Sequence, residues 1–147
     1  DGMGTPVDVC VIDGSPAYIA HVGDSRDYRI DKSGKAVRTT KDHSLMEYML
    51  DSGVITPEEA ETHPQRHVIT RALGTELHVE ADTYITPFEK NDTLLLCSDG
   101  LTNMVSDEKI AEITASAKDP AQAANELINA ANAAGGTDNI TVVLARK

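Results

Sequence analysis

Aromatic residues are scarce in this sequence, since its 147 residues include no Trp, one Phe and four Tyr. The hydrophobic core must therefore be built from Val, Ile, Leu and Ala. Hydrophobic residues make up 40% of the chain and charged residues 25%, which excludes a disordered chain. We expect a single domain over residues 1–147, a length that supports a sizeable core.

Basic residues are also few, with 13 Lys and Arg against 24 Asp and Glu and a net charge of -11. A surface of this sign repels a nucleic-acid backbone, so we expect no nucleic-acid partner. An acidic enzyme that acts on a phosphorylated substrate would need divalent cations to neutralise both sets of charge. Charge alone favours the simpler interpretation, an ordinary soluble protein with an acidic surface.

Cysteines and long apolar runs are rare too. Cys10 and Cys97 both lie within short apolar runs, where buried reduced thiols are expected rather than a disulfide. No stretch reaches the roughly 20 apolar residues that span a bilayer, and no signal-peptide pattern opens the chain. We therefore expect a cytoplasmic protein that has no membrane partner.

The hydrophobic pattern predicts strands joined by short turns. Asp13-Gly14-Ser15-Pro16 has the composition of a hairpin turn. Residues 79–86 alternate between apolar and polar side chains, whereas Leu94–Cys97 is continuously apolar and fits a strand buried on both faces. The expected strands are 5–12, 16–22, 27–30, 36–39, 79–86, 93–97 and 140–145.

Helical signals occur in two places. Residues 44–52 and a segment beginning at Thr56-Pro57 predict two helices in a polar, His-rich insertion that we expect on the surface. Two amphipathic helices are predicted after Ser106 and after Asp119. Strands followed by helices and a last strand indicate an α+β fold, with helices packed on antiparallel sheet.

Three aspartates stand at strand ends or in glycine-rich turns. Asp99 follows the buried strand, Asp138 precedes the last strand, and Asp24 follows the run 18–22. A carboxylate at such a position is costly unless a partner compensates its charge, and hard divalent cations prefer oxygen ligands. Each aspartate also has an ordinary interpretation as a turn or cap residue, and Asp24 could pair with Arg26. Spacing alone does not show that the three side chains meet.

Five short blocks occur along the chain in a fixed order. They are His21-Val22-Gly23-Asp24-Ser25-Arg26, Lys41-Asp42-His43-Ser44-Leu45, Ile69-Thr70-Arg71-Ala72-Leu73-Gly74, Leu96-Cys97-Ser98-Asp99-Gly100-Leu101-Thr102 and Gly135-Gly136-Thr137-Asp138-Asn139-Ile140-Thr141. This series closely resembles the bacterial branch of the PPM family, the type 2C metal-dependent protein serine/threonine phosphatases. The resemblance extends from about Gly2 to the C-terminus.

The resemblance implies a two-sheet antiparallel β-sandwich flanked by helices, with the N-terminal part of the family's domain missing. It implies two Mn²⁺ or Mg²⁺ ions in a complete site and a third, weaker one. Asp99 and Asp138 match ligands of the paired metals, and Asp24 matches a ligand of the third. Asn139 matches the residue beside the last ligand, where it would orient that ligand. Metal-activated water would then hydrolyse phosphoserine and phosphothreonine in proteins.

The resemblance also implies a flap over about residues 44–66, beside the active site. His63 and His67 lie in or next to it and receive no catalytic role. Asn103 stands where some members have a further aspartate, which weakens the expected third metal site. Asp1 has two alignments: in one it is the ligand that bridges both metals, and in the other it is a flanking residue.

The implied partners are phosphorylated protein substrates and a cognate serine/threonine kinase system. A non-catalytic phosphatase-like module that binds or regulates a partner is the alternative. A divalent-ion-binding regulatory domain is a further one. An N-terminal segment carrying the remaining ligands and a phosphate-gripping arginine would favour the enzyme over the non-catalytic module. Manganese-dependent hydrolysis of an aryl phosphate, abolished by EDTA and by Asp99→Asn, would argue against the regulatory domain.

Overall fold

The computed structural model describes residues 2–147, so Asp1 and its two alternative roles lie outside the described residues. Within these described residues, seven strands form two antiparallel sheets, and five helices accompany them. The strands are β1 (Val7–Ile12), β2 (Ala17–Val22), β3 (Arg26–Ile30), β4 (Ala36–Arg38), β5 (Asp82–Thr86), β6 (Thr93–Cys97) and β7 (Val142–Arg146). The helices are α1 (Leu45–Asp51), α2 (Pro57–Thr62), α3 (Asp99–Thr102), α4 (Asp107–Ser116) and α5 (Pro120–Ala133).

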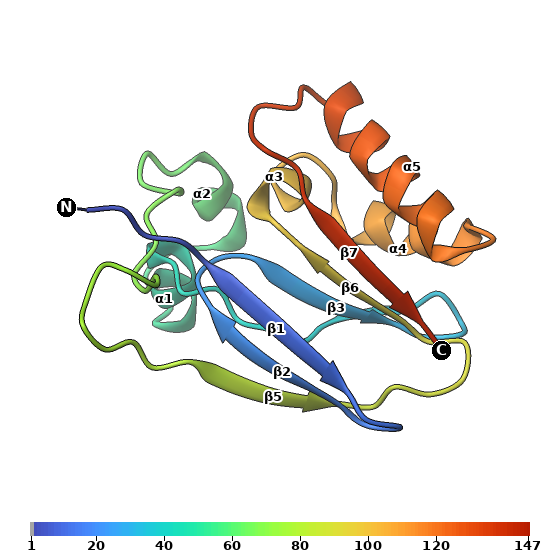
Figure 1. The fold of residues 1–147 in the computed structure, drawn as a ribbon. Helices are drawn as coiled ribbons and strands as arrows, with labels where there is room; N and C mark the ends of the chain where they lie inside the picture. Colours follow the sequence, from blue (N-terminus) through green and yellow to red (C-terminus); the bar gives the residue numbers. More distant parts are fainter. Residues whose placement is uncertain (1) are drawn as a thin grey trace.

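The strand order is β1-β2-β5 in one sheet and β4-β3-β6-β7 in the other. Figure 1 shows the two sheets stacked on each other, with α4 and α5 against the outer face of the four-stranded sheet. Ala17 of β2 and Leu94 of β6 pack together from facing sheets, beside Phe88. The α+β sandwich expected from the sequence is therefore confirmed.

The first hairpin determines where Asp24 lies. β1 and β2 pair from Val7 opposite Val22 to Ile12 opposite Ala17, with the turn at residues 13–16. Side chains alternate between the faces, so that Ile19 is buried against the other sheet while Tyr18 is 46% exposed on the outer face. Gly23 and Asp24 consequently leave β2 at the end opposite to the hairpin turn.

The register of the second sheet brings three chain segments to one end. Arg26 of β3 pairs with Cys97 of β6, and Cys97 in turn pairs with Val142 of β7. Because Asp24 precedes this row and Asp99 follows it on the neighbouring strand, both aspartates leave the sheet at the same end. The antiparallel arrangement places the loop before β7 there too.

The main core lies between the four-stranded sheet and the helices. Tyr28 and Leu95 point from the sheet toward Leu101, Ile110 and Leu127, which are all buried. The opposite face of β6 meets the three-stranded sheet, which explains why Leu94–Cys97 is apolar throughout. Ser106 and Asp119 cap the N-termini of α4 and α5, and the side chain of each accepts a hydrogen bond from a backbone N–H of the first turn.

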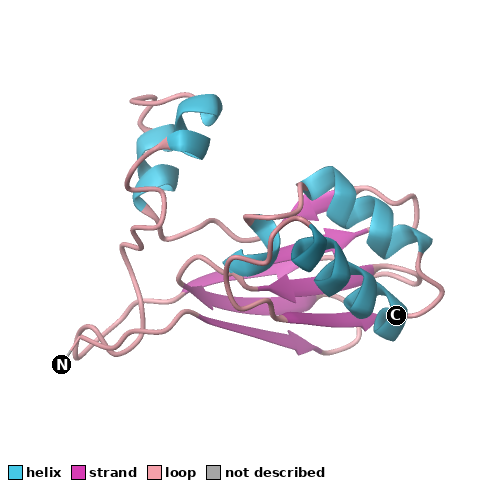
Figure 2. Ribbon diagram, turned by 90° about the horizontal axis from the view of Figure 1, so that it is seen from above, coloured by secondary structure: helices cyan, strands magenta, loops and turns pink. Residues whose placement is uncertain are grey.

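Helices α1 and α2 stand apart from the sheets, as Figure 2 shows for the helical unit at the left of the molecule. Ser44 caps α1, and Thr56 with Glu59 forms a capping box at the start of α2. Both helices were expected from the sequence. Capping matters here because these helices bury little: Met46 is the one buried residue of α1, and α2 has none.

Four sequence expectations need correction. Helix α3 was not predicted, because four residues are too short to show a period. Strand β5 begins at Asp82 rather than residue 79, since its last partner on β2 is His21. Strand β7 runs over Val142–Arg146 rather than 140–145. Cys97 is buried as expected, but Cys10 is only half-buried because β1 is an edge strand; both thiols are free.

Candidate metal centre

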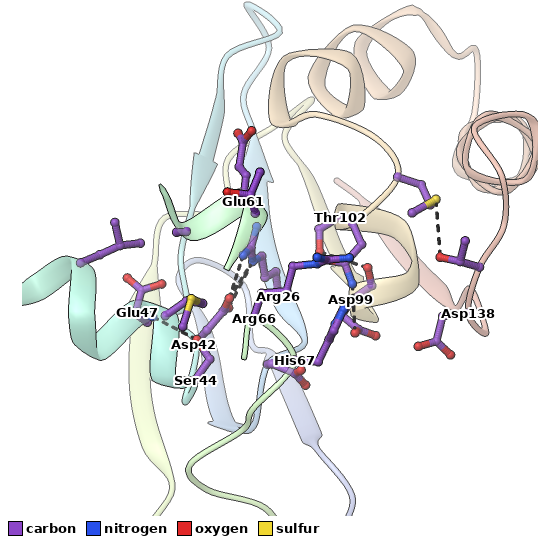
Figure 3. Close-up of a pocket in the computed structure, with 18 of the residues that line it drawn as sticks. Arg26, Asp42, Ser44, Glu47, Glu61, Arg66, His67, Asp99, Thr102 and Asp138 are labelled. Atoms are coloured by element: carbon purple, nitrogen blue, oxygen red, sulfur yellow. Dashed lines mark hydrogen bonds and ion pairs between the residues drawn. The ribbon is translucent and has the colours of Figure 1, made fainter. Parts of the chain in front are cut away.

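A cavity of about 1060 Å³ lies between the end of the four-stranded sheet and the α1–α2 insertion. Asp24, Asp99 and Asp138, from three separate segments, all line it. Asp24 and Asp99 are half-buried, and Asp138 is exposed. The structure thus brings the three aspartates singled out in the sequence to one cavity. Figure 3 shows Asp99 and Asp138 on one side of this space and Glu47 with Asp42 on the other.

Asp24 is oriented by the glycine before it. Gly23 has a φ of +118°, and a β-carbon there would lie 2.3 Å from the β-carbon of Pro6. Only glycine accepts both the backbone angle and the close approach. The chain therefore turns sharply after β2, and Asp24 enters the cavity directly after the turn.

Asp99 begins α3 directly after the end of β6. Asn103 donates a hydrogen bond from Nδ2 to Oδ2 of Asp99 at 3.2 Å. Asn103 also lines the cavity, so the position discussed as a possible further ligand is close to Asp99. In this arrangement its amide nitrogen supports the Asp99 carboxylate, and one turn of helix connects the two residues.

The side chain of Ser98 joins the loop that carries Asp138 to the loop that carries Asp99. The hydroxyl of Ser98 donates to the carbonyl oxygen of Asn139 at 3.1 Å and accepts from the N–H of Thr141 at 3.0 Å. Oδ1 of Asp138 accepts a hydrogen bond from the N–H of Asn139 at 2.6 Å. Asn139 thus orients its neighbours through its main chain in this structure.

The electrostatics of the cavity favour a cation. Burial raises the pKa of Asp24, and the nearby charges of Asp99 and Asp42 raise it further. These shifts record carboxylates that repel one another at a partly desolvated place. The sequence allowed an ion pair between Asp24 and Arg26, but this pairing is wrong. The guanidinium of Arg26 instead binds the carboxylate of Asp42 at 2.8 Å.

The carboxylate oxygens of the cavity suit a divalent metal, but few of them are available to any single ion. The three aspartates supply only carboxylate oxygens, the ligands that Mg²⁺ and Mn²⁺ prefer. Among residues 2–147, however, no three His, Cys, Asp or Glu side chains converge closely enough to hold one ion. Magnesium commonly uses one or two carboxylates and several waters, so a shared cavity is compatible with carboxylates divided among ions.

A charged network on the opposite wall was not found from the sequence. Arg38 Nη2 binds Asp42 at 2.6 Å and also Glu47 of α1 at 3.1 Å, which ties the insertion to β4. Asp42 lies in one of the five blocks, but no local pattern predicts partners 4 and 16 residues away. Arg66 and His67 also line the cavity, whereas Nδ1 of His63 accepts a hydrogen bond from the N–H of Gln65.

Comparisons with known proteins place the chain in a family. The family model described as stage II sporulation protein E (SpoIIE) matches residues 33–147. The chain belongs to this family, of the PPM phosphatase type. No helix among the described residues is long and apolar enough to cross a membrane.

The relatives of this PPM-type chain are named as phosphatases. It is 44% identical over 147 residues to the serine/threonine phosphatase stp of Listeria innocua, covering 100% of this chain and 58% of that protein. The crystal structure of the Mycobacterium tuberculosis serine/threonine phosphatase PstP/Ppp has a TM-score of 0.90 and 41% identity, over 97% of this chain and 60% of that one. The chain thus spans well under two thirds of the length of these relatives.

One solved structure bears on the metal. The catalytic domain of PstP in complex with two manganese ions has a TM-score of 0.86 and 39% identity, over 97% of this chain and 58% of that one. A member of the family with this fold therefore binds manganese.

Proposed function

We propose that this chain supplies the metal-binding part of a phosphatase that hydrolyses phosphoserine and phosphothreonine in proteins. The observation that carries the proposal is the common cavity lined by Asp24, Asp99 and Asp138. The names of the relatives support the reaction and the substrate class. A phosphorylated protein is the expected partner, with a cognate serine/threonine kinase as the source of its phosphate. The cytoplasmic location stays a prediction.

The three aspartates would hold Mn²⁺ or Mg²⁺. A bound divalent ion lowers the pKa of coordinated water, which supplies hydroxide near neutral pH, and offsets charge on the phosphoryl oxygens. Asp99 and Asp138 are the ligands expected for a metal pair, and Asp24 for a third ion. Asn103 would support Asp99 through its amide, and the backbone of Asn139 would orient Asp138.

The rest of the cavity fits a charged phosphorylated side chain. Its volume leaves room for a phosphoryl group, and Arg66 and His67 line the wall formed by the segment after α2. The segment 44–66, which contains α1 and α2, would act as the flap. Asp42 already binds Arg26 and Arg38, which leaves these two arginines less available to a substrate phosphate.

Manganese-dependent hydrolysis of an aryl phosphate tests the proposal. The assay is run on this chain and on a version extended at its N-terminus with the segment that the relatives have. We expect activity in the extended protein that EDTA and Asp99→Asn abolish. Glu112→Gln is the matched control, because it removes one negative charge on the exposed face of α4. An extended protein that is inactive with manganese would contradict the enzyme assignment.

A non-catalytic binding module is the second candidate. It is favoured by the lack of a tight three-residue ligand cluster within residues 2–147. Such a module would bind a phosphopeptide without releasing phosphate, in the extended protein as well as in this chain. A divalent-ion-binding regulatory domain would instead bind manganese and change the affinity for a protein partner.

A further inference from the structure

We infer that His43 is a positioning residue for Asp24. It holds the backbone of Gly23, and it can do so only as the tautomer with its proton on Nε2. The inference rests on the proposed function in one respect, since it takes Asp24 as a metal ligand. His43 is 8% exposed, and it lies at the junction of the β2–β3 turn, the root of the α1–α2 insertion and β5. Each of these three segments makes a hydrogen bond to it.

The turn that carries Asp24 is bound by His43 at two atoms. The N–H of Gly23 donates to Nδ1 of His43 at 3.0 Å, and the carbonyl oxygen of Gly23 accepts from the N–H of His43 at 2.7 Å. Pro6 packs against the α-carbon of Gly23. Gly23 is thus held between Pro6 and His43, and Asp24 is the next residue along the chain.

These contacts determine which nitrogen of His43 carries the proton. Nδ1 accepts from Gly23, so it has no proton, and the neutral ring must carry its proton on Nε2. Nε2 lies 3.1 Å from Oδ2 of Asp82, to which it donates. Arg71 Nη1 also lies 3.1 Å from Nε2, but a protonated nitrogen cannot accept there. Arg71 instead donates to Oδ1 of Asp82 at 2.7 Å and to the carbonyl oxygen of Glu80 at 3.0 Å.

Asp82 therefore keeps His43 in the tautomer that Gly23 requires. The hydrogen bonds from His43 and Arg71 lower the pKa of Asp82, so this carboxylate is ionised at neutral pH. The ring of His21 packs against His43 with 4.7 Å between the centroids, which restricts rotation of the imidazole. In metal sites a carboxylate commonly fixes the tautomer of a ligating histidine. Here Asp82 fixes the tautomer of a histidine that acts through the backbone of Gly23.

The main chain of His43 connects the same turn to the insertion. Its carbonyl oxygen accepts from the N–H of Thr70 at 2.8 Å, and Ser44 forms an antiparallel bridge with Ile69. The two ends of the insertion therefore close on the residue that binds Gly23. A movement of the backbone at the root of the insertion would therefore shift His43, and with it the turn that carries Asp24.

Two substitutions separate positioning from packing. His43→Asn keeps an acceptor close to the position of Nδ1 and lacks the group that reaches Asp82. His43→Gln extends its amide toward Asp82 and has no acceptor at the Nδ1 position. Both remove a buried imidazole, so both lower the midpoint of thermal unfolding, and a purely structural role predicts similar effects on metal binding.

The first readout is the Mn²⁺ dissociation constant, measured by electron paramagnetic resonance of free manganese on the metal-free chain. We expect His43→Gln to weaken binding about 10- to 100-fold, the range for residues that orient a metal ligand, and His43→Asn to stay within about threefold of the wild type. Equal losses in the two variants, or no loss in His43→Gln, would overturn the inference.

The second readout needs no metal. In the ¹⁵N spectrum of the imidazole, Nδ1 of His43 should behave as an unprotonated nitrogen and Nε2 as a protonated one. The Gly23 amide should resist hydrogen exchange in the wild type and in His43→Asn and lose that protection in His43→Gln. The opposite tautomer would overturn the inference.

The two proposals fail in different ways. If the wild type binds manganese and Asp24→Asn weakens binding while His43→Gln does not, only the role of His43 is wrong. If the wild type binds no manganese, the proposed metal centre is wrong, and the role of His43 in positioning a metal ligand is wrong too.

Discussion

Gly100 lies so close to Asn139 that a β-carbon on Gly100 would sit 2.3 Å from the carbonyl oxygen of Asn139. These residues follow Asp99 and Asp138 directly, so the approach of their backbones brings both aspartates to the same cavity. Ser98 reinforces the approach through its hydrogen bonds to Asn139 and Thr141. A glycine is needed at this point because no side chain fits between the two loops.

Gly100→Ala should therefore separate the two loops. The added methyl group meets backbone atoms that cannot rotate away, and overpacking of this kind costs about 1–3 kcal/mol of unfolding free energy. We also expect weaker Mn²⁺ binding, because Asp99 and Asp138 move apart. Urea denaturation and manganese titration measure the two effects. Unchanged stability and affinity would show that the loops are not held in this contact.

Asp24→Asn should have opposite effects with and without metal. In the metal-free protein it removes a carboxylate whose pKa is raised by burial and by the charges of Asp99 and Asp42, so the protein should melt at a higher temperature. With saturating Mn²⁺ the wild type should gain more stability than the variant, since the variant lacks the proposed carboxylate ligand. Thermal unfolding with and without manganese checks this. Equal gains from manganese would argue against Asp24 as a ligand.

A buried cluster between the sheets predicts an unusual pH dependence. Burial and the charge of Asp8 raise the pKa of Asp27 to about 7. Burial lowers the pKa of His21, but the hydrogen bond and charge of Asp8, at 2.5 Å, outweigh it, so the net pKa is raised. Both carboxylate oxygens of Asp27 and Nε2 of His21 have no hydrogen-bond partner within the described part of the chain. The native state therefore favours the protonated form of both groups.

The sign follows from these two raised values. A group with a raised native pKa stabilises the fold at low pH, and this stability is lost as the pH rises through the native pKa. The free energy of unfolding should thus fall between about pH 4, the unfolded pKa of Asp27, and pH 7, its native pKa. Asp27→Asn should remove much of this slope and stabilise the protein at pH 8 by about 1–3 kcal/mol. Urea denaturation at pH 5.5 and 8 measures both, and an unchanged slope in the variant would refute the account.

Asp42→Asn should destabilise the junction between β3, β4 and α1. The side chain of Asp42 is 8% exposed and neutralises Arg26 and Arg38 together. Removing one partner of a buried pair leaves uncompensated charge, and because the arginines are partly hydrated we expect a cost of about 1–3 kcal/mol. Asp51→Asn is the control, since its ion pair with Lys41 is exposed to solvent and should contribute little to stability. Equal costs for the two variants would contradict the network's role.

The sequence predicted the elements better than the contacts between them. Strand alternation and helix caps such as Thr56 are local signals, and they located most of the strands and helices. The row Arg26, Cys97 and Val142 depends on strand register across up to 71 residues, which no local pattern specifies. The short helix at Asp99 also lacked a local signal.

For the candidate site, too, the sequence predicted the residues better than the contacts between them. Asp24, Asp99 and Asp138 were chosen by their places at strand ends and in ordered blocks. The partners of Arg26 and the tautomer of His43 could not be predicted, because they depend on side chains such as Asp42 and Asp82 that folding brings from elsewhere. Arg26, the first residue of β3, pairs with Asp42 rather than Asp24 because the fold places the Asp42 carboxylate within reach of its guanidinium.

The central proposal is that Asp99 and Asp138 hold divalent metal in the cavity that Asp24 also lines, and manganese binding to this chain tests it most directly. Calorimetric titration of Mn²⁺ should be run on the wild type, Asp99→Asn, Asp138→Asn and the Glu112→Gln control. We predict binding by the wild type and the control that is weakened about 10-fold or more in both aspartate variants, a loss of about 1.4 kcal/mol or more. Binding that is unchanged in Asp99→Asn and Asp138→Asn would contradict the account.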